Sequence, residues 1–245
     1  GAGFIGSCLV QQLILAGYQV TVIDNFSSGD LLNLKEVVNS PLLEIYRSEV
    51  DNCPSRIAGL IAGSSHVFHL AAKTSVEESM TNPVEYFETN FLGTITVIEA
   101  MKLANVKHLI FSSTSAVYGE TSLFPTGESV KPNPISPYAM SKLLSEEYCQ
   151  RESSISTVCL RYFNVYGDRP NMRGSYFPVI NLFLNKAQSD EPLPIINGGS
   201  QSRDFVNVLD VARANIAAMQ IQHGHHIFNV GSGREIKISE IADKI

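Results

Sequence analysis

The sequence predicts an α/β protein built on a doubly wound parallel sheet, with a smaller C-terminal lobe for a substrate. Two observations support this fold class. Short apolar runs rich in β-branched residues alternate with helical patterns along most of the chain, which favours parallel strands joined by helices. Several of these runs also end in small or polar residues, as expected where a ligand occupies the carboxyl edge of such a sheet.

Composition argues against several classes of protein. The 245 residues are 44% hydrophobic and 17% charged, with a net charge of -6, so the chain can bury a substantial core and offers no basic stripe for nucleic acid. We find no apolar run of bilayer length and no basic-then-apolar leader, so we expect a cytoplasmic protein without a membrane partner. The four cysteines show no C-x-x-C spacing, so we expect reduced, mostly buried thiols.

The first element is a glycine-rich turn at residues 1–6, a literal G-x-G-x-x-G, followed by a helical pattern. In a Rossmann-type unit such glycines let the backbone approach a pyrophosphate at the helix N-terminus. The next strand, at 18–24, ends in Asp24, whose carboxylate can bind ribose hydroxyls and repels a 2′-phosphate. We therefore expect NAD rather than NADP. Its candidate contacts in this unit are Gly3, Phe4, Ile5, Gly6, Asp24 and Asn25.

The following elements alternate in the same way. A helical pattern covers 31–44, a strand is predicted at 43–46, and a short helix follows residue 51. A buried strand at 66–72 ends in Ala71 and Ala72, which leave room for the cofactor, while His69 is expected only to pack. The long helix predicted at 82–104 carries Asn90 among apolar positions. Its amide either makes an internal contact or holds a loop near the cofactor, and we count it among the cofactor site.

The candidate chemistry lies in a strand at 106–114 and in a helix that begins near Pro137, after a loop with four prolines. Tyr138 and Lys142 are four residues apart, so the phenol and the ammonium share one helix face. A phenol has a pKa of about 10 in water, and a nearby cation favours the phenolate. With Thr114 at the end of the strand, this set could remove a proton from a substrate alcohol while a cofactor takes the hydride.

The last third predicts a substrate lobe. A strand at 157–164 ends in Asn164, and loops at 168–200 surround one amphipathic helix at 177–187. Arg203 is a candidate phosphate contact, because a guanidinium can bind two oxygens at once. A helix at 210–220 and a strand and turn at 227–233 follow. The histidines at 223–226 have no cysteine or carboxylate companion, so we expect a solvated loop there and no metal.

Seven segments, taken together, resemble one family. They are G-A-G-F-I-G (1–6), I-D-N (23–25), H-L-A-A (69–72), S-S-T-S-A-V-Y-G (112–119), S-P-Y-A-M-S-K (136–142), R-Y-F-N-V-Y-G (161–167) and R-D-F-V (203–206). Their order resembles the extended short-chain dehydrogenase/reductase family, and most closely its nucleotide-sugar epimerases. This resemblance implies that Thr114, Tyr138 and Lys142 are the catalytic set. It also implies that Asn164 and Arg203 hold the nucleotide sugar, Arg203 at its diphosphate, and that the protein is a homodimer joined through helices near 83–104 and 138–152.

The family pattern also extends past both ends of this sequence. The usual T-G-x-x-G-x-x-G places one glycine and a complete strand before Gly1, and relatives carry an Arg-Pro-Gly-Asp segment beyond Ile245. We therefore expect a fragment, without the first strand of the sheet and without the C-terminal end. Residues 1–166 would form the NAD-binding domain and 167–245 a truncated, mainly substrate-binding lobe, with 227–233 returning to the main sheet.

The residues after Thr114 bear on the reaction. Sugar dehydratases of the family place Asp-Glu there, and nucleotide-uronate decarboxylases keep the Glu, whereas this chain has Ser115 and Ala116. The simplest expectation is epimerisation of a UDP-sugar, or of another nucleotide-diphosphate sugar, at carbon 4 by transient oxidation and re-reduction. A decarboxylase or reductase, and a non-catalytic NAD-binding scaffold, are the alternatives. The sequence leaves open whether the sugar is a hexose, an N-acetylhexosamine or a uronate.

Overall fold

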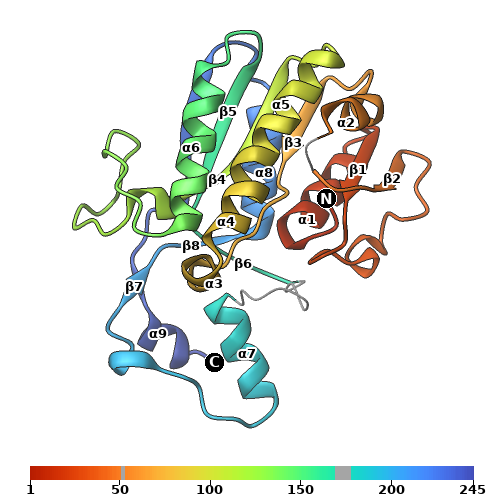
Figure 1. Ribbon diagram of the computed structural model, residues 1–245. Helices are drawn as coiled ribbons and strands as arrows, with labels where there is room; N and C mark the ends of the chain where they lie inside the picture. Colours follow the sequence, from red (N-terminus) through yellow and green to blue (C-terminus); the bar gives the residue numbers. More distant parts are fainter. Residues whose placement is uncertain (51–52, 169–177) are drawn as a thin grey trace.

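Parallel strands organise the chain, as the sequence predicts, in a computed structural model that describes residues 1–50, 53–168 and 178–245 (Figure 1). One hydrogen-bonded group has four parallel strands in the order β3 (His66–His69), β4 (His108–Thr114), β5 (Ser156–Tyr162) and β9 (His225–Val230). A second group pairs β1 (Val20–Asp24) with β2 (Leu43–Arg47), also in parallel. Within the described ranges, the predicted sheet therefore appears as two parallel groups.

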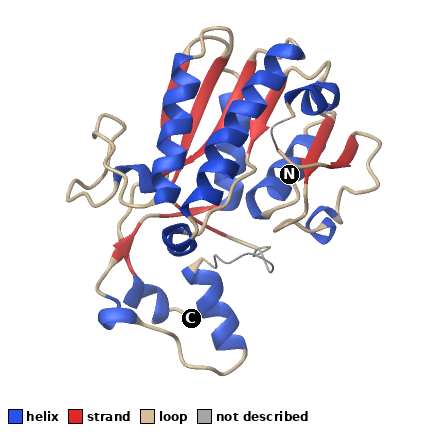
Figure 2. Cartoon of the chain, in the orientation of Figure 1, coloured by secondary structure: helices blue, strands red, loops and turns tan. Residues whose placement is uncertain are grey.

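Helices cover both faces of the strands (Figure 2). One face carries α2 (Pro54–Ile61), α5 (Gly93–Leu103) and α6 (Pro137–Arg151), and the other carries α1 (Phe4–Leu15) and α8 (Val208–Ala218). Because side chains alternate along a strand, Leu109 and Phe111 of β4 pack into the first core while Ile110 packs into the second. This double burial explains why three consecutive residues of β4, Leu109 to Phe111, are apolar.

The remaining elements form a smaller part below the strands in Figure 1. They are α7 (Val179–Gln188), η4 (Ile196–Gly199), β7 (Ser202–Arg203), β10 (Ile236–Lys237) and α9 (Ile238–Ala242). A separate core of Phe183, Phe205, Ile238 and Ile241 holds this part together. A parallel pair, β6 (Asn164–Tyr166) with β8 (Phe205–Asn207), connects it to the strands above. The first residue of the predicted helix 177–187 lies outside the described residues.

The predicted helix at 31–44 is wrong. Only a short 3-10 turn, η1 (Leu31–Leu34), forms there, and the chain then continues in turns to β2. Asp30 caps this turn, because its Oδ1 accepts a hydrogen bond from Leu32 N at 2.9 Å, and Asn33 Nδ2 donates to Ala2 O at 2.9 Å. These bonds hold the segment against the glycine turn instead of letting a helix propagate.

The helix predicted at 82–104 forms as one helical run from Pro83 to Leu103 that contains a π-helical turn. After α3 (Val76–Thr81), the chain forms α4 (Pro83–Tyr86), then a π-helical turn, η2 (Phe87–Leu92), and then α5. A π-helical turn inside an α-helix is rare and is often found at a functional site. Asn90 lies within this turn. In the described part of the chain, no helix is both long enough and apolar enough to cross a membrane.

Candidate functional site

A cavity of about 1820 Å³ lies along the carboxyl ends of the parallel strands and continues to the smaller part of the molecule. Its wall includes the glycine turn, the ends of β1, β4 and β5, the loop after β3 and the first turns of α6. The loop at 119–136 and the turn at 231–235 contribute the remaining sides. Every site residue predicted from the sequence lines this cavity except Asn90.

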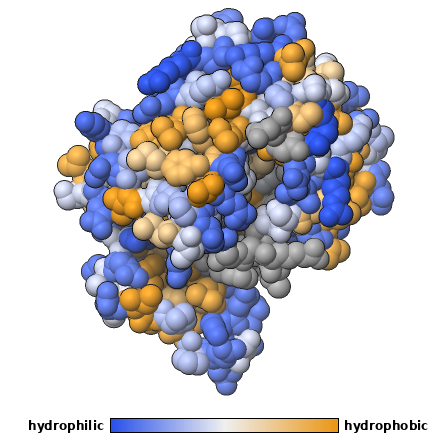
Figure 3. Space-filling model, in the orientation of Figure 1, coloured by the Kyte–Doolittle hydropathy of each residue, from blue (hydrophilic) through white to orange (hydrophobic). Residues whose placement is uncertain are grey.

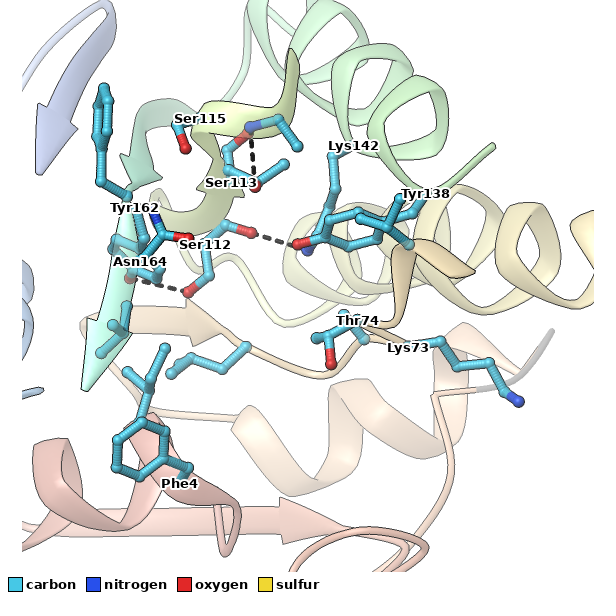
Figure 4. Close-up of a pocket in the computed structure, with 18 of the residues that line it drawn as sticks. Phe4, Lys73, Thr74, Ser112, Ser113, Ser115, Tyr138, Lys142, Tyr162 and Asn164 are labelled. Carbon is cyan, nitrogen blue, oxygen red and sulfur yellow. Dashed lines mark hydrogen bonds between the residues drawn. The ribbon is translucent and has the colours of Figure 1, made fainter. Parts of the chain in front are cut away.

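The first turns of α6 place Tyr138 and Lys142 on the cavity wall. Ser136 caps this helix, because its Oγ accepts a hydrogen bond from Ala139 N at 3.2 Å. One turn beyond Tyr138, Lys142 Nζ donates to the carbonyl of Ser112 at 2.8 Å (Figure 4). The phenol and the ammonium are therefore presented together from a capped helix that is also bonded to the end of β4.

Lys142 is almost completely buried, with 3% of its surface exposed. Its Nζ lies 4.7 Å from the centre of the Phe111 ring, as in a cation–π contact. Burial lowers the pKa of Lys142 to about 8, and the nearby Glu146 carboxylate opposes that change. At neutral pH the side chain is thus a cation beside Tyr138, which favours the phenolate form of the tyrosine.

Two further contacts position the hydroxyls of Tyr138 and Thr114. The ring of Tyr138 meets the buried ring of Tyr86 edge to face, with 6.4 Å between ring centres and 84° between planes. Thr114 is the last residue of β4, and its Oγ1 accepts a hydrogen bond from Ala116 N at 3.1 Å. The Thr114 hydroxyl therefore keeps its O–H available to donate into the cavity.

The glycine turn fits a dinucleotide. Helix α1 begins after Gly3 without a side-chain cap, so the N–H groups of its first turn have no partner within the helix. A Cβ added to Gly3 would meet nothing within 4 Å, whereas a Cβ on Gly6 would lie 2.7 Å from Gly1 O. Gly3 therefore leaves open space on the cavity wall, and Gly6 allows the close packing beneath it. Open space at a helix N-terminus suits a pyrophosphate.

Asp24 lies on the same wall, at the end of β1. Its Oδ2 accepts a hydrogen bond from Ala2 N at 2.8 Å, and its Oδ1 accepts one from Phe26 N at 2.8 Å. The carboxylate therefore fixes the glycine turn, and it retains lone pairs for the hydroxyls of a ribose. The Oδ1 of the neighbouring Asn25 accepts a hydrogen bond from Ser27 N at 3.0 Å.

Asn90 lies behind the cavity, with 1% of its surface exposed. Its Oδ1 accepts a hydrogen bond from Lys73 N at 2.9 Å, and its Nδ2 donates to Lys73 O at 3.0 Å and to Ser141 Oγ at 3.1 Å. The amide thus fastens the loop that carries Ala71 and Ala72 to helix α6. Of the two roles that the sequence allowed, an internal contact or the holding of a loop near the cofactor, the hydrogen bonds to Lys73 favour the holding of the loop.

Asn164 and Arg203 line the cavity where the smaller part begins. Asn164 Nδ2 donates to the carbonyl of Asp204 at 2.9 Å. The Asp204 carboxylate accepts hydrogen bonds from the backbone N–H groups of Ser232 and Gly233 at 2.7 and 2.8 Å, so it fixes the turn after β9. Sequence reasoning missed Asp204, although its position directly after Arg203 offered a signal.

Asn229 on β9 fastens the proline-rich loop to the sheet and was also missed. Tyr118 Oη donates to Asn229 Oδ1 at 2.7 Å, while Asn229 N donates to Glu128 Oε1 and Asn229 Nδ2 to Thr126 O, both at 2.8 Å. These partners are about a hundred positions away in the sequence. No local spacing could have linked them.

The histidines take structural roles. His69 is hydrogen-bonded through Nε2 to Thr94 Oγ1 at 3.1 Å, and burial lowers its pKa to about 3, so it is neutral at neutral pH. His225 Nδ1 bonds Thr157 Oγ1 at 2.9 Å, and His226 Nε2 bonds the carbonyl of His223 at 2.9 Å. Residues 1–50, 53–168 and 178–245 contain no group of three or more histidine, cysteine or acidic side chains suited to a metal ion.

The cavity lies at the carboxyl edge of parallel strands and is bordered by an open glycine turn at a helix N-terminus. This arrangement is typical of a dinucleotide-binding protein. The family model described as the NAD dependent epimerase/dehydratase family matches residues 1–231. The chain belongs to this family, and its cofactor is NAD.

Solved structures and a curated relative agree with this assignment. The UDP-N-acetylglucosamine 4-epimerase of Methanobrevibacter ruminantium M1, in complex with UDP-N-acetylmuramic acid, is 37% identical with a TM-score of 0.90, over 99% of this chain and 77% of that one. The UDP-glucose 4-epimerase of Thermotoga maritima, with UDP-glucose, is 36% identical with a TM-score of 0.89, over 99% and 78%. The UDP-N-acetyl-alpha-D-glucosaminuronate decarboxylase of Bacillus cytotoxicus is 36% identical, over 100% of this chain and 77% of the relative.

Proposed function

We propose that this chain catalyses the NAD-dependent epimerisation of a UDP-sugar at carbon 4. The observation that carries the proposal is the meeting of Thr114, Tyr138 and Lys142 on one cavity wall, with Ser115 and Ala116 directly after the threonine. This set can move a proton to and from a sugar hydroxyl. It lacks the additional acid after Thr114 that elimination of a hydroxyl would need.

In the proposed reaction Tyr138, as the phenolate, takes the proton of the 4-hydroxyl while Thr114 donates a hydrogen bond to the same oxygen. Bound NAD would supply reversible hydride chemistry at carbon 4 of the sugar. Lys142 keeps the phenolate stable and holds the nicotinamide ribose. The 4-keto sugar then turns over within the cavity, and Tyr138 returns the proton on re-reduction. Proton transfer by such a positioned group is worth roughly 10²–10⁴-fold in rate.

The proposal divides the binding work between two parts of the chain. Residues 1–166 hold NAD, and residues 167–245 mainly hold the sugar nucleotide, with the strand near 227–233 belonging to the sheet. The contacts assigned to NAD are Gly3, Phe4, Ile5, Gly6, Asp24, Asn25, Ala71, Ala72, Tyr138 and Lys142, with Asn90 acting from behind the loop. Asn164 and Arg203 hold the nucleotide sugar, Arg203 through its diphosphate. Both residues line the cavity, which supports this assignment.

The second candidate is a nucleotide-sugar decarboxylase or reductase. The similarity to the Bacillus cytotoxicus decarboxylase favours it. Against it, this chain has Ala116 at the position where nucleotide-uronate decarboxylases of the extended short-chain dehydrogenase/reductase family keep a glutamate. A panel of UDP-hexoses, UDP-N-acetylhexosamines and UDP-uronates, incubated without added cofactor and followed by NMR, separates the candidates. Epimerase activity gives a pair of 4-epimers, whereas loss of carbon dioxide or a requirement for added NADH contradicts the proposal.

The role of Tyr138 has a direct test. Replacing Tyr138 by Phe removes the proton acceptor but keeps the ring, so we expect turnover to fall by at least 10²-fold while NAD stays bound. The matched control is Tyr148→Phe on the same helix, a partly buried tyrosine that does not line the cavity and whose hydroxyl donates to Glu99 Oε1 at 3.4 Å. Substantial remaining turnover in Tyr138→Phe would contradict the catalytic assignment.

We further propose that the protein forms a homodimer through α5 and α6. Apolar side chains gather on the face over these helices (Figure 3). Leu92 is 40% exposed and Met140 is 39% exposed, and partly buried apolar residues lie beside them at 91, 95, 143 and 144. An exposed apolar surface of this kind is typical of a contact between protein chains.

A further inference from the structure

Glu146 is a buried carboxylate directly behind the candidate site. It lies on α6, one turn after Lys142, with 1% of its surface exposed, and it is not part of the cavity wall. Arg161 of β5 pairs with it, through Nε to Oε1 at 3.0 Å and through Nη2 to Oε2 at 2.6 Å. Ser113 Oγ donates to Glu146 Oε1 as well. The carboxylate is thus held in a buried ion pair with charge-assisted hydrogen bonds.

The surroundings of Lys142 show why this charge matters. Five elements contribute polar groups around Lys142 and Glu146. Helix α6 itself contributes Tyr138 and Cys149, and strand β5 contributes Cys159 and Arg161. The others are His69 of β3, Tyr118 of η3 (Ser115–Tyr118) and the hydroxyl of Ser113 of β4. Burial holds the pKa of His69 at about 3. The contact with Cys149, together with burial, raises the pKa of Cys159 above its ordinary value. Glu146 is the only one of these described residues that carries a carboxylate.

The charges near the phenol can then be counted. Lys142 and Arg161 each carry a positive charge and Glu146 a negative one, so this buried group has a net charge of +1. A phenolate at Tyr138 brings the total to zero, which favours that form in a medium of low dielectric constant. Without Glu146 two cations would face each other across a buried region, and the proton on Lys142 is the one that can leave, because a guanidinium keeps its proton.

We propose that Glu146, fixed by Arg161 and Ser113, is a positioning residue of the reaction that keeps Lys142 protonated so that Lys142 can stabilise the Tyr138 phenolate. Glu146 touches neither the cavity nor a ligand, and acts only through Lys142. The inference rests on the proposed roles of Tyr138 and Lys142. Its consequence is specific: the charge of Glu146 sets the pH above which activity falls, because activity requires the protonated lysine.

The test compares two substitutions, one that removes the negative charge of Glu146 and one that removes the positive charge of Arg161. Glu146→Gln removes a negative charge, so the high-pH limb of kcat/KM should move to lower pH by about one unit or more. Arg161→Gln leaves the carboxylate unopposed, so the same limb should move to higher pH. A purely structural role would weaken folding in both variants without moving the limb in opposite directions. Limbs that stay in place, or that move in the same direction, would overturn the proposal.

Two controls keep the test decisive. Val158→Ala removes buried methyl groups from the same strand as Arg161 and should lower stability while the pH limb stays in place. If either single variant does not fold, Glu146→Gln combined with Arg161→Gln restores the net charge, and a buried ion pair can often be replaced without loss of stability. The limb of this double variant should lie close to that of the parent protein, and a limb displaced to lower pH would contradict the charge argument.

A readout independent of turnover separates this inference from the proposed function. The protonation of Lys142 can be followed by NMR of lysine labelled at Cε, with the signal assigned by its loss in Lys142→Met. Its titration should move down in Glu146→Gln and up in Arg161→Gln, even if the substrate or the reaction has been assigned wrongly. Retained turnover in Tyr138→Phe would refute the proposed function, whereas an unmoved lysine titration would refute the role of Glu146.

Discussion

At the scale of single residues, the site depends on side chains that lie one layer behind the cavity. Asn90 is an example, since it satisfies both the N–H and the C=O of Lys73 from within a π-helical turn. A side-chain amide that imitates a backbone partner in this way fixes a loop that has no strand or helix of its own. The loop in question carries Ala71 and Ala72 on the cavity wall.

Replacing Asn90 by Ala should therefore affect binding as well as stability. The two buried backbone groups of Lys73 lose their partner, so we expect the free energy of unfolding to fall by about 1–3 kcal/mol and NAD to bind several-fold more weakly. Urea unfolding and calorimetric titration with NAD measure the two effects. Asn215→Ala, which removes a buried amide from α8, is the control and should destabilise the fold with little change in NAD affinity. Unchanged NAD affinity in Asn90→Ala would contradict the loop-holding role.

Single residues also show what local sequence could predict. Tyr138, Lys142 and Thr114 could be found from the sequence, because helical periodicity relates positions four apart and strand ends meet at one edge of a parallel sheet. Asn229 and Asp204 could not be found in this way. Their partners come from distant segments, and only the folded chain brings them together.

At the scale of elements, helix α6 carries most of the candidate chemistry, and its first turn determines where Tyr138 lies. Ser136 is nearly buried and satisfies Ala139 N, and Pro137 occupies the first helical position with its fixed backbone angle. The helix therefore begins at a defined residue, Pro137, one position before the phenol.

The cap of α6 offers a test at this scale. Ser136→Ala should lower the free energy of unfolding by about 1 kcal/mol, because one N–H of the first turn loses its partner. We also expect a loss of kcat, since fraying of this turn moves Tyr138. Asn207→Ala removes the equivalent cap of α8, where Asn207 Oδ1 accepts from Leu209 N at 2.9 Å, and should cost similar stability with kcat retained. Equal effects of both variants on kcat would argue against a special role for this cap.

Most elements follow from the hydrophobic pattern, and the exceptions have physical causes. The strands could be predicted because their apolar runs are buried by helices on both faces. The helix predicted at 31–44 is limited to one 3-10 turn, in which Asn33 bonds the carbonyl of the distant Ala2, a contact that the local pattern does not contain. The π-helical turn at Phe87–Leu92 has the same apolar spacing as an ordinary helix, so the pattern could not reveal it.

At the scale of the whole molecule, the ligand cavity and the proposed dimer face meet at Leu92, which lines the cavity and is also exposed on the apolar face. The cavity follows the carboxyl ends of the strands, whereas the apolar face lies over α5 and α6, the helices that cover one side of them. Because Tyr138 and Met140 belong to the same helix, association through this face would press on the helix that carries the phenol.

The proposed dimer can be tested with one charged substitution. Met140→Glu places a charge on the apolar face at a residue that does not line the cavity, so we expect sedimentation velocity to show a shift from dimer to monomer. Leu209 on α8 is similarly exposed and lies on the opposite side of the strands, so Leu209→Glu should leave the dimer intact. A parent protein that sediments as a monomer, or a Met140→Glu variant that stays dimeric, would contradict the proposed interface.

The edge-to-face contact between Tyr86 and Tyr138 has an optical consequence. The sequence contains nine tyrosines and no tryptophan, so no indole band covers the near-ultraviolet absorption of the phenol rings. Ionisation of Tyr138 changes that absorption, and subtraction of the Tyr138→Phe spectrum isolates the change. The proton transfer proposed for this site can thus be recorded as a difference spectrum on the unlabelled protein, with the tyrosine itself as the reporter.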